Sequence, residues 1–160
     1  MKRVYIVRHA KSSWADLSVR DIERPLNPRG NRDAPRIAQF ISDRTPVIDL
    51  LLCSTSQRTR ETAAHFDNHI SFTKVEYKEK IYHAPYTDIV DVIIGIPSEV
   101  SWAMVIGHNP GSTDLYNHFA SSYLDNLPTC GAFLLSIDGA WEDIDQQNTK
   151  VSQLVYPKML

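Results

Sequence analysis

Three short apolar runs in this chain are each followed by a polar turn, and this pattern constrains the fold most. The runs are Val4–Val7, Asp49–Cys53 and Trp102–Ile106. Apolar runs of this length, rich in branched residues, are typical of strands that are buried on both faces. Helical patterns lie between them, and strands that alternate with helices predict an α/β protein. We therefore expect a three-layer α/β/α sandwich with a mostly parallel central sheet.

The other elements are predicted from helical spacing, capping residues and turn residues. Asn27 followed by Pro28 is typical of a helix N-terminus, and the serines of Ser54-Thr55-Ser56 can cap a helix that begins near Gln57. We expect the first helix to end near Thr45-Pro46. Further helices are predicted over Tyr86–Ile96 and from about Pro110, and further strands at Thr73–Tyr77 near a sheet edge, Ala132–Ile137 and Ser152–Tyr156.

Size and charge set the outer limits on the class of protein. A chain of 160 residues with 42% hydrophobic content fits one domain over residues 1–160. The net charge of −2 indicates neither a nucleic-acid partner nor an anionic membrane surface. No apolar run approaches the roughly 20 residues that span a bilayer, and no signal peptide is visible. We expect a cytoplasmic monomer, with Cys53 and Cys130 as buried free thiols.

Cationic and imidazole side chains follow the three apolar strands. Arg8 and His9 end the first, Arg58 opens the helix after the second, and His108 follows the third. Carboxyl ends of parallel strands meet at one edge of a sheet, where ligands bind in open α/β folds. We therefore expect these four side chains to form one anion site, helped by the N-termini of the following helices.

The residue types indicate phosphoryl transfer. A neutral imidazole is a nucleophile at physiological pH, and an arginine matches phosphate oxygens with a planar fork of donors. Arg60 competes with Arg58 for this role by proximity, but Arg58 shares a helix face with Thr62. We interpret Arg60 and Glu61 as a solvated pair.

Three motifs carry a resemblance to a known family. Arg8-His9-Ala10, Ser54-x-x-x-Arg58-x-x-x-Thr62-Ala63 and Gly107-His108-Asn109-Pro110 resemble the signature motifs of the histidine phosphatase superfamily, also called phosphoglycerate mutase-like. The short chain, Arg24-Pro25-Leu26-Asn27-x-x-Gly30, Ile81-Tyr82-x-Ala84 and Pro157-Lys158 resemble its SixA-type phosphohistidine phosphatase branch.

The resemblance implies a role for each motif residue. His9 would become phosphorylated, while Arg8, Arg58 and His108 would surround the phosphoryl oxygens, and no metal or other cofactor would be needed. Water would then hydrolyse the phosphohistidine. Lys11 and Ser12 follow His9 closely enough to contact a phosphate, although each can equally face solvent.

The proton donor for the leaving group stays open. Larger relatives place a carboxylic acid after the third strand, where this chain offers Glu79, Tyr82 and His83, and Asp16, Asp21 or Asp88 can reach the site from loops. Phosphohistidine leaves as an imidazole and asks less of an acid than an alkoxide does. The chain is thus interpreted as a metal-independent phosphatase of a phosphohistidine-bearing protein. A small-molecule phosphomonoesterase and a non-catalytic phosphate-binding module are the alternatives.

Other site types fit less well. The pattern Cys-x5-Arg of cysteine phosphatases fails because Thr59 stands where the arginine would be, and there is no Walker A or GxGxxG sequence. His65 and His69 have a spacing that can chelate a metal, but no third ligand accompanies them. We interpret them as a surface pair. His83 and His118 are also assigned no role at a strand end.

Overall fold

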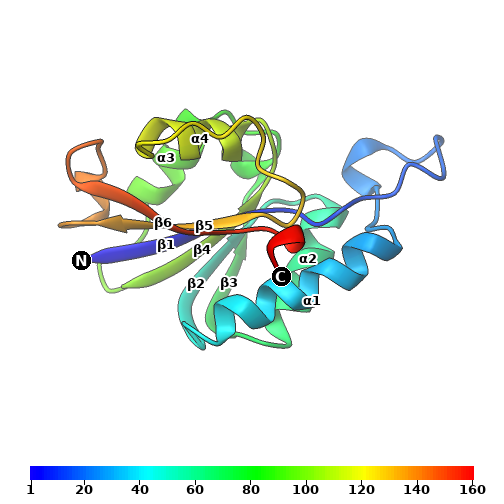
Figure 1. Ribbon diagram of the computed structural model, residues 1–160, viewed down its shortest axis with the longest axis horizontal. Coiled ribbons are helices and arrows are strands. Elements are labelled where there is room, and N and C mark those ends of the chain that lie inside the picture. Colours follow the sequence, from blue (N-terminus) through cyan, green and yellow to red (C-terminus); the bar gives the residue numbers. More distant parts are fainter.

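The computed structural model, which describes residues 1–160, contains one six-stranded sheet with helices on both faces (Figure 1). The strands are β1 (Lys2–Arg8), β2 (Val47–Cys53), β3 (Ser71–Tyr77), β4 (Trp102–Gly107), β5 (Ala132–Ile137) and β6 (Thr149–Val155). The helices are α1 (Pro28–Ser42), α2 (Gln57–Asp67), α3 (Tyr86–Ile94) and α4 (Gly111–Phe119). Four 3-10 turns are η1 (Asp21–Glu23), η2 (Glu79–Ile81), η3 (Trp141–Asp143) and η4 (Pro157–Met159).

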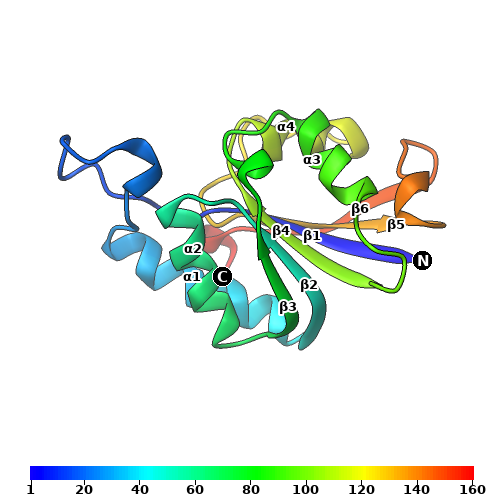
Figure 2. The ribbon, with the colours of Figure 1, turned by 180° about the vertical axis from the view of Figure 1, so that it is seen from behind.

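The sheet has the order β3-β2-β4-β1-β5-β6. The first four of these strands are parallel, β5 is antiparallel to β1, and β6 is antiparallel to β5. Helices α1 and α2 cover one face and α3 and α4 the other, as both ribbon views show (Figures 1 and 2). The predicted three-layer sandwich is confirmed, and β3 is the predicted edge strand.

The sequence pattern of β1 explains its central place. Val4 and Ile6 belong to the apolar cluster under α3 and α4, whereas Tyr5 and Val7 belong to the cluster on the opposite face. All four are at most 1% exposed. Because successive side chains of a strand point to opposite faces, a run that is apolar throughout must be covered on both.

The predicted helix starts are confirmed, but α1 ends at Ser42, about three residues before the predicted Thr45-Pro46. The side chain of Asn27 accepts a hydrogen bond from the Gly30 amide at the start of α1, as its N-cap role requires. Helix α3 ends at Ile94 rather than at Ile96, because Gly95 caps it ahead of Pro97. No α-helix in the structure is long and apolar enough to cross a membrane.

The polar connection between β1 and α1 is held together at its two ends. Ser12 and Leu26 form an antiparallel bridge, and the Ser13 amide donates to the Pro25 carbonyl at 2.8 Å. The segment between them projects away from the sheet and returns through η1 (Figures 1 and 2). The segment is not wholly solvent-exposed, because Ser12 and Arg24 are buried.

Two glycines allow close backbone contacts beside the strand ends. A Cβ atom at Gly30 would lie 2.2 Å from the Lys11 carbonyl oxygen, and one at Gly111 would lie 2.1 Å from the Ala84 carbonyl oxygen. Helices α1 and α4 thus begin in direct contact with the chain segments that surround the strand ends.

Candidate active site

The ends of β1, β2 and β4 lie side by side because of the register of the sheet. Arg8 is paired with Gly107, and Cys53 is paired with Ile106. The next residue of each strand is therefore His9, Ser54 or His108, all at the same edge. The His9 amide donates to the Gly107 carbonyl at 3.0 Å, which holds the chain in place where the strand ends.

Arg58 lies between the two histidines. Its guanidinium is 1% exposed, with Nε 3.4 Å from His9 Nε2 and Nη2 3.4 Å from His108 Nδ1. The start of α2 fixes this position, since Ser56 is its N-cap. Thr62 links α2 to β1, because its hydroxyl accepts from the Ala10 amide at 3.0 Å and donates to the Arg58 carbonyl.

The hydrogen bonds of His9 define its tautomer. Nδ1 lies 2.7 Å from the Ala10 carbonyl oxygen, which can only accept, so Nδ1 carries the proton. Burial is the main cause that lowers the pKa of His9 to about 3. The hydrogen bond to Ala10 raises the pKa, whereas the nearby guanidiniums of Arg58, Arg8 and Arg24 lower it further. At neutral pH, His9 therefore presents an unprotonated Nε2 towards Arg58.

His108 is held in the same way. Its Nδ1 faces the donor Nη2 of Arg58, so Nε2 carries the proton and donates to the Ser54 hydroxyl at 2.8 Å. Burial is the main cause that lowers the pKa of His108, with smaller effects from His9 and Arg58. The two imidazole rings have centroids 5.3 Å apart. Both rings are neutral in a pocket that is otherwise cationic.

Arg8 lies on the other side of His9. Its Nη1 donates to the Leu127 carbonyl oxygen at 2.8 Å, whereas its buried Nε has no hydrogen-bond partner. Burial lowers the pKa of Arg8. A buried guanidinium with a free donor is suited to bind an anion.

These residues surround a pocket of about 200 Å³. Its lining includes the four predicted site residues, both Lys11 and Ser12, and five further residues: Trp14, Arg24, His83, Asn109 and Thr129. Four of the lining residues are cationic and none is a carboxylate. Ser12 is buried and accepts a hydrogen bond from Arg24, whereas Lys11 is half-buried. The charge of the lining fits a phosphate dianion.

Asp21 contacts the site from behind Arg58. Its Oδ2 accepts from Arg58 Nη2 at 3.0 Å, and its carbonyl oxygen accepts from Nη1 at 2.7 Å. Burial alone would raise the pKa of this carboxyl. Hydrogen bonds from Tyr82, His83 and Arg24, together with the charge of Arg58, outweigh burial and hold the pKa far below its usual value. Asp21 therefore stays ionised and orients Arg58.

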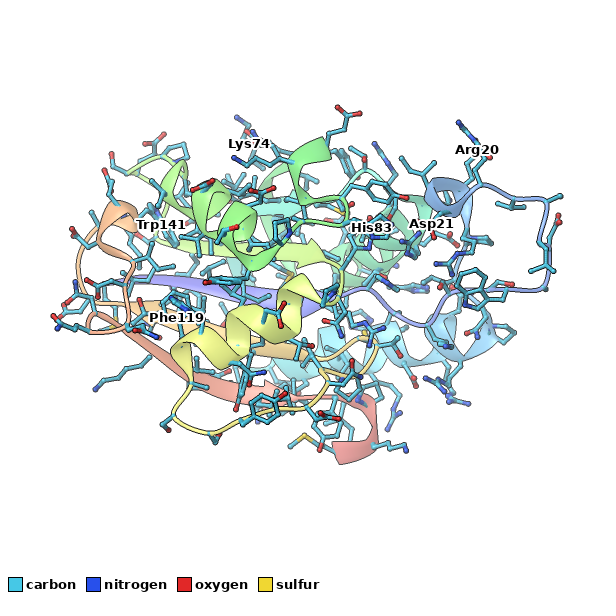
Figure 3. All side chains as sticks on the ribbon, turned by 90° about the horizontal axis from the view of Figure 1, so that it is seen from above. Arg20, Asp21, Lys74, His83, Phe119 and Trp141 are labelled. Atoms are coloured by element: carbon cyan, nitrogen blue, oxygen red, sulfur yellow. The ribbon has the colours of Figure 1, made fainter.

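His83, one of the candidate proton donors, lies at the site. It has a φ of 49°, in the left-handed region that residues other than glycine rarely adopt. Its ring centroid lies 5.1 Å from that of His108, and Nε2 lies 2.9 Å from Asp21 Oδ2. Figure 3 shows the labelled Asp21 and His83 beside each other, at the end of the molecule opposite Trp141 and Phe119.

The candidate proton donors differ in whether they lie at the site. Tyr82 donates a hydrogen bond to Asp21, and burial followed by that bond raises its pKa. Glu79 is exposed in η2, and Asp16 is exposed and accepts hydrogen bonds from Ser18. Asp88 lies in the first turn of α3. Of the six candidates, only Asp21, Tyr82 and His83 are brought together at the site.

The structure corrects the predicted pairing of Arg60 with Glu61 and shows the contacts of His65 and His69. Arg60 and Glu61 do not pair: Arg60 lies over the ring of Tyr77, and Glu61 accepts from the Leu26 amide. His65 and His69 instead bond to side chains of α1, with Nε2 of the first 2.9 Å from the Asn31 amide oxygen. No three His, Cys, Asp or Glu side chains are grouped as metal ligands would be.

The cysteines are as predicted. Cys53 and Cys130 are both buried and free. Burial raises the pKa of the Cys53 thiol to about 12, so it is not a nucleophile at neutral pH.

Two histidines and two arginines thus meet at one edge of the sheet, in an arrangement suited to bind a phosphoryl group, and comparison with known proteins assigns the family. The chain belongs to the histidine phosphatase superfamily (branch 1), whose family model matches residues 4–86. The protein is a phosphatase of this superfamily, with the phosphoglycerate mutase-like fold.

Two relatives are similar in sequence over most of this chain. An uncharacterised protein of Mycobacterium tuberculosis is 31% identical over 149 residues, covering 87% of this chain and 92% of that protein. A chloroplastic protein of Arabidopsis thaliana, also uncharacterised, is 32% identical and covers 89% of this chain and 70% of its own length.

Two solved structures are similar to this chain over nearly its whole length. A candidate phosphohistidine phosphatase SixA from Nakamurella multipartitia is 27% identical, with a TM-score of 0.85 and coverage of 98% and 96%. A second candidate SixA, from Agrobacterium tumefaciens, is 29% identical, with a TM-score of 0.82 and 98% coverage of both chains.

Proposed function

We propose that this protein hydrolyses phosphohistidine in a phosphorylated protein, through a phosphorylated intermediate on His9 and without a metal. One observation carries the proposal: the Nε2 lone pair of His9 faces Arg58 inside a pocket with four cations and no carboxylate. The SixA assignment of the two solved relatives supports the substrate class.

In the first step, His9 Nε2 attacks phosphorus and the bond from phosphorus to the substrate nitrogen breaks. The bond electrons go to the leaving imidazole, which keeps or takes up one proton. Arg58 and Arg8 are placed to bind the equatorial oxygens, where charge is highest in the transition state. The free Nε donor of Arg8 fits this role.

In the second step, water attacks phospho-His9, giving inorganic phosphate and restoring the free imidazole. His108 supports both steps. Its Nδ1 faces the pocket beside Arg58, where it can take up a proton once an oxyanion is bound. The hydrogen bond to Ser54 keeps this ring in orientation.

The substrate class follows from the acid that the site lacks. An alkoxide leaving group needs a proton donor near its oxygen, and the one carboxyl in contact with the site residues, Asp21, is ionised and cannot serve. An imidazole leaving group has no such need. The pocket of about 200 Å³ accommodates the phosphoryl group, so the rest of the substrate must extend from its mouth. A protein substrate satisfies both conditions.

The test compares three substrates: a phosphohistidine-bearing protein, free phosphohistidine and p-nitrophenyl phosphate. Each is assayed with wild type, His9→Ala and His65→Ala, in the presence of a chelator. His65 is the matched control because it is a half-buried histidine on α2, outside the pocket. We expect turnover of the protein substrate by wild type and His65→Ala, and none by His9→Ala.

Three outcomes would contradict the proposal. Loss of turnover with chelator would contradict a metal-independent reaction. Preference for p-nitrophenyl phosphate would favour a small-molecule phosphomonoesterase, with His83 or Tyr82 as the proton donor to test. Binding of phosphate without turnover of any substrate would favour a non-catalytic phosphate-binding module. Circular dichroism of His9→Ala confirms that lost turnover is not lost folding.

A further inference from the structure

A second and larger depression adjoins the phosphate pocket. It has a volume of about 680 Å³ and is lined by six cations and one side-chain carboxylate; we call it the basic groove. Its cations are Arg8, Lys11, Arg29, Arg32, Arg36 and Lys158. Six of the 17 lysines and arginines therefore line this one groove, although the chain as a whole has a net charge of −2.

The basic groove is continuous with the phosphate pocket. Arg8, Lys11 and Thr129 line both cavities. Arg29 joins them, since its Nη2 donates to Thr129 Oγ1 at 3.3 Å. A ligand whose phosphoryl group lies against His9 can therefore extend directly into the groove.

Two elements from distant parts of the sequence form the groove. Helix α1 contributes three arginines, and η4 lies alongside it near the C-terminus (Figures 1 and 2). Arg36 connects the two, because its Nη2 donates to the Leu160 main-chain oxygen at 3.0 Å. The three arginines are at spacing i, i+3 and i+7, so they follow one side of the helix.

The acidic charge within the groove is too small to neutralise it. Asp33 is 4% exposed and is the one side-chain carboxylate in the lining, with Arg29, Arg32 and Arg36 at 3.9, 3.5 and 3.5 Å. A single carboxylate therefore serves three guanidiniums. Arg32 keeps 67% of its side chain exposed, and neither Lys158 nor Lys11 has an ion pair.

The dimensions favour an extended partner over a single small anion. From Arg29 to Arg36 the helix rises about 10 Å. An extended peptide rises about 3.3 Å per residue, so this distance matches about three residues. A second phosphate bound by Lys11 and Arg8, which line both cavities, would leave Arg32, Arg36 and Lys158 without a ligand. Tyr156 is the only aromatic residue in the lining, which does not make a stacking platform for nucleotide bases.

The geometry points to a docking groove for an acidic peptide segment next to the phosphohistidine of the substrate protein. Aspartate or glutamate within about three residues of the phosphohistidine would lie against Arg32 and Lys158, with the phosphoryl group at His9. This inference rests on the proposed phosphatase function for the link to turnover, but the groove can be tested alone by binding.

The experiment uses two synthetic peptides with one central histidine. One is flanked on both sides by three acidic residues, and the other has glutamine and asparagine at the same places. Fluorescein-labelled, unphosphorylated forms measure binding by anisotropy, and chemically phosphorylated forms measure kcat/KM. The variant Arg32→Gln/Lys158→Gln removes two groove cations and leaves Arg29 and Arg36 with Asp33. Lys74→Gln/Lys150→Gln removes two exposed cations from β3 and β6 instead (Lys74 is labelled in Figure 3).

We expect the acidic peptide to bind more tightly and to have the higher kcat/KM. The groove variant should weaken binding of the acidic peptide and lower its kcat/KM, each by about fivefold to tenfold, as expected for the loss of two exposed ion pairs. The fall in kcat/KM should come from a higher KM, with kcat unchanged. The neutral peptide should not respond, nor should the control variant change either peptide. At ionic strength of about 1 M, the two peptides should become equivalent.

Equal binding of the two peptides would overturn the proposal, as would a groove variant that binds like wild type. Binding of inorganic polyphosphate but not of the acidic peptide, if lost in the groove variant, would replace a peptide partner with a phosphate chain. If binding follows the prediction but no peptide is hydrolysed, the groove stands and the proposed phosphatase function fails. Melting temperatures of both variants show whether they fold.

Discussion

Buried, neutral His9 makes the stability of the protein depend on pH in a way that can be worked out. Its pKa is lowered from 6.5 to about 3 in the folded protein, mainly by burial. Below pH 6.5 the unfolded chain takes up a proton at this residue, whereas the folded protein takes it up only near pH 3. The unfolded state thus binds more protons between these values, so the free energy of unfolding falls as the pH falls.

The magnitude follows from the two pKa values. From pH 7 to pH 5, protonation of His9 in the unfolded chain alone lowers the free energy of unfolding by about 2 kcal/mol. The result is insensitive to the folded pKa as long as that value is well below 5. His108, whose pKa is lowered by burial as well, acts in the same direction. Replacing His9 with glutamine should therefore remove about half of the contribution of this pair.

Urea unfolding at pH 7 and pH 5, in a buffer without phosphate, measures this difference for wild type and His9→Gln. His65→Gln, half-buried on α2 and outside the pocket, is the control and should lose as much stability as wild type. We expect the loss between the two pH values to be about 2 kcal/mol smaller for His9→Gln than for wild type. An equal loss in the two proteins would refute the description of His9 as a buried neutral imidazole.

Three further predictions test the site and the packing of the helix α4 beside it. Vanadate should raise the melting temperature of wild type but not of Arg58→Ala; an equal rise would place the anion elsewhere. Asp21→Asn should lower kcat/KM about tenfold, because Arg58 loses a charged partner, and unchanged kinetics would contradict the orienting role. Gly111→Ala should cost about 1–3 kcal/mol in urea unfolding, since its Cβ would lie 2.1 Å from the Ala84 oxygen. Gly95→Ala, with its nearest atoms at 3.6 Å, is the control, and equal stability of the two would refute the close contact.

The local sequence was sufficient to predict the site residues that follow the ends of strands. His9 and His108 follow strands whose continuous apolar pattern predicts burial between two layers. Parallel strands must end at the same edge, so their meeting could be inferred without knowing any distance. The Ser54-Thr55-Ser56 run predicted a helix that begins near Gln57, and in the structure Ser56 is the N-cap of α2.

Asp21 and His83 show where this reasoning ends. Asp21 begins the short 3-10 turn η1 and His83 lies in a turn, and neither segment is long enough for periodicity to indicate the direction of a side chain. Asp21 was one of several acidic residues that could reach the site as a proton donor, but its four cationic or donor neighbours keep it ionised. His83 reaches the site through a left-handed backbone conformation, which a sequence pattern does not reveal.

The sequence by itself determined the layered α/β architecture, the edge at which the site lies and the four side chains that meet there. These features depend on periodicity and on residue types next to strand ends, which are local properties. Only the tertiary structure decided the protonation states of His9 and Asp21 and the junction of the phosphate pocket with the basic groove. The physical reason is that burial and charge neighbours come from residues far apart in the chain, such as Arg32 and Lys158, whose proximity no local pattern encodes.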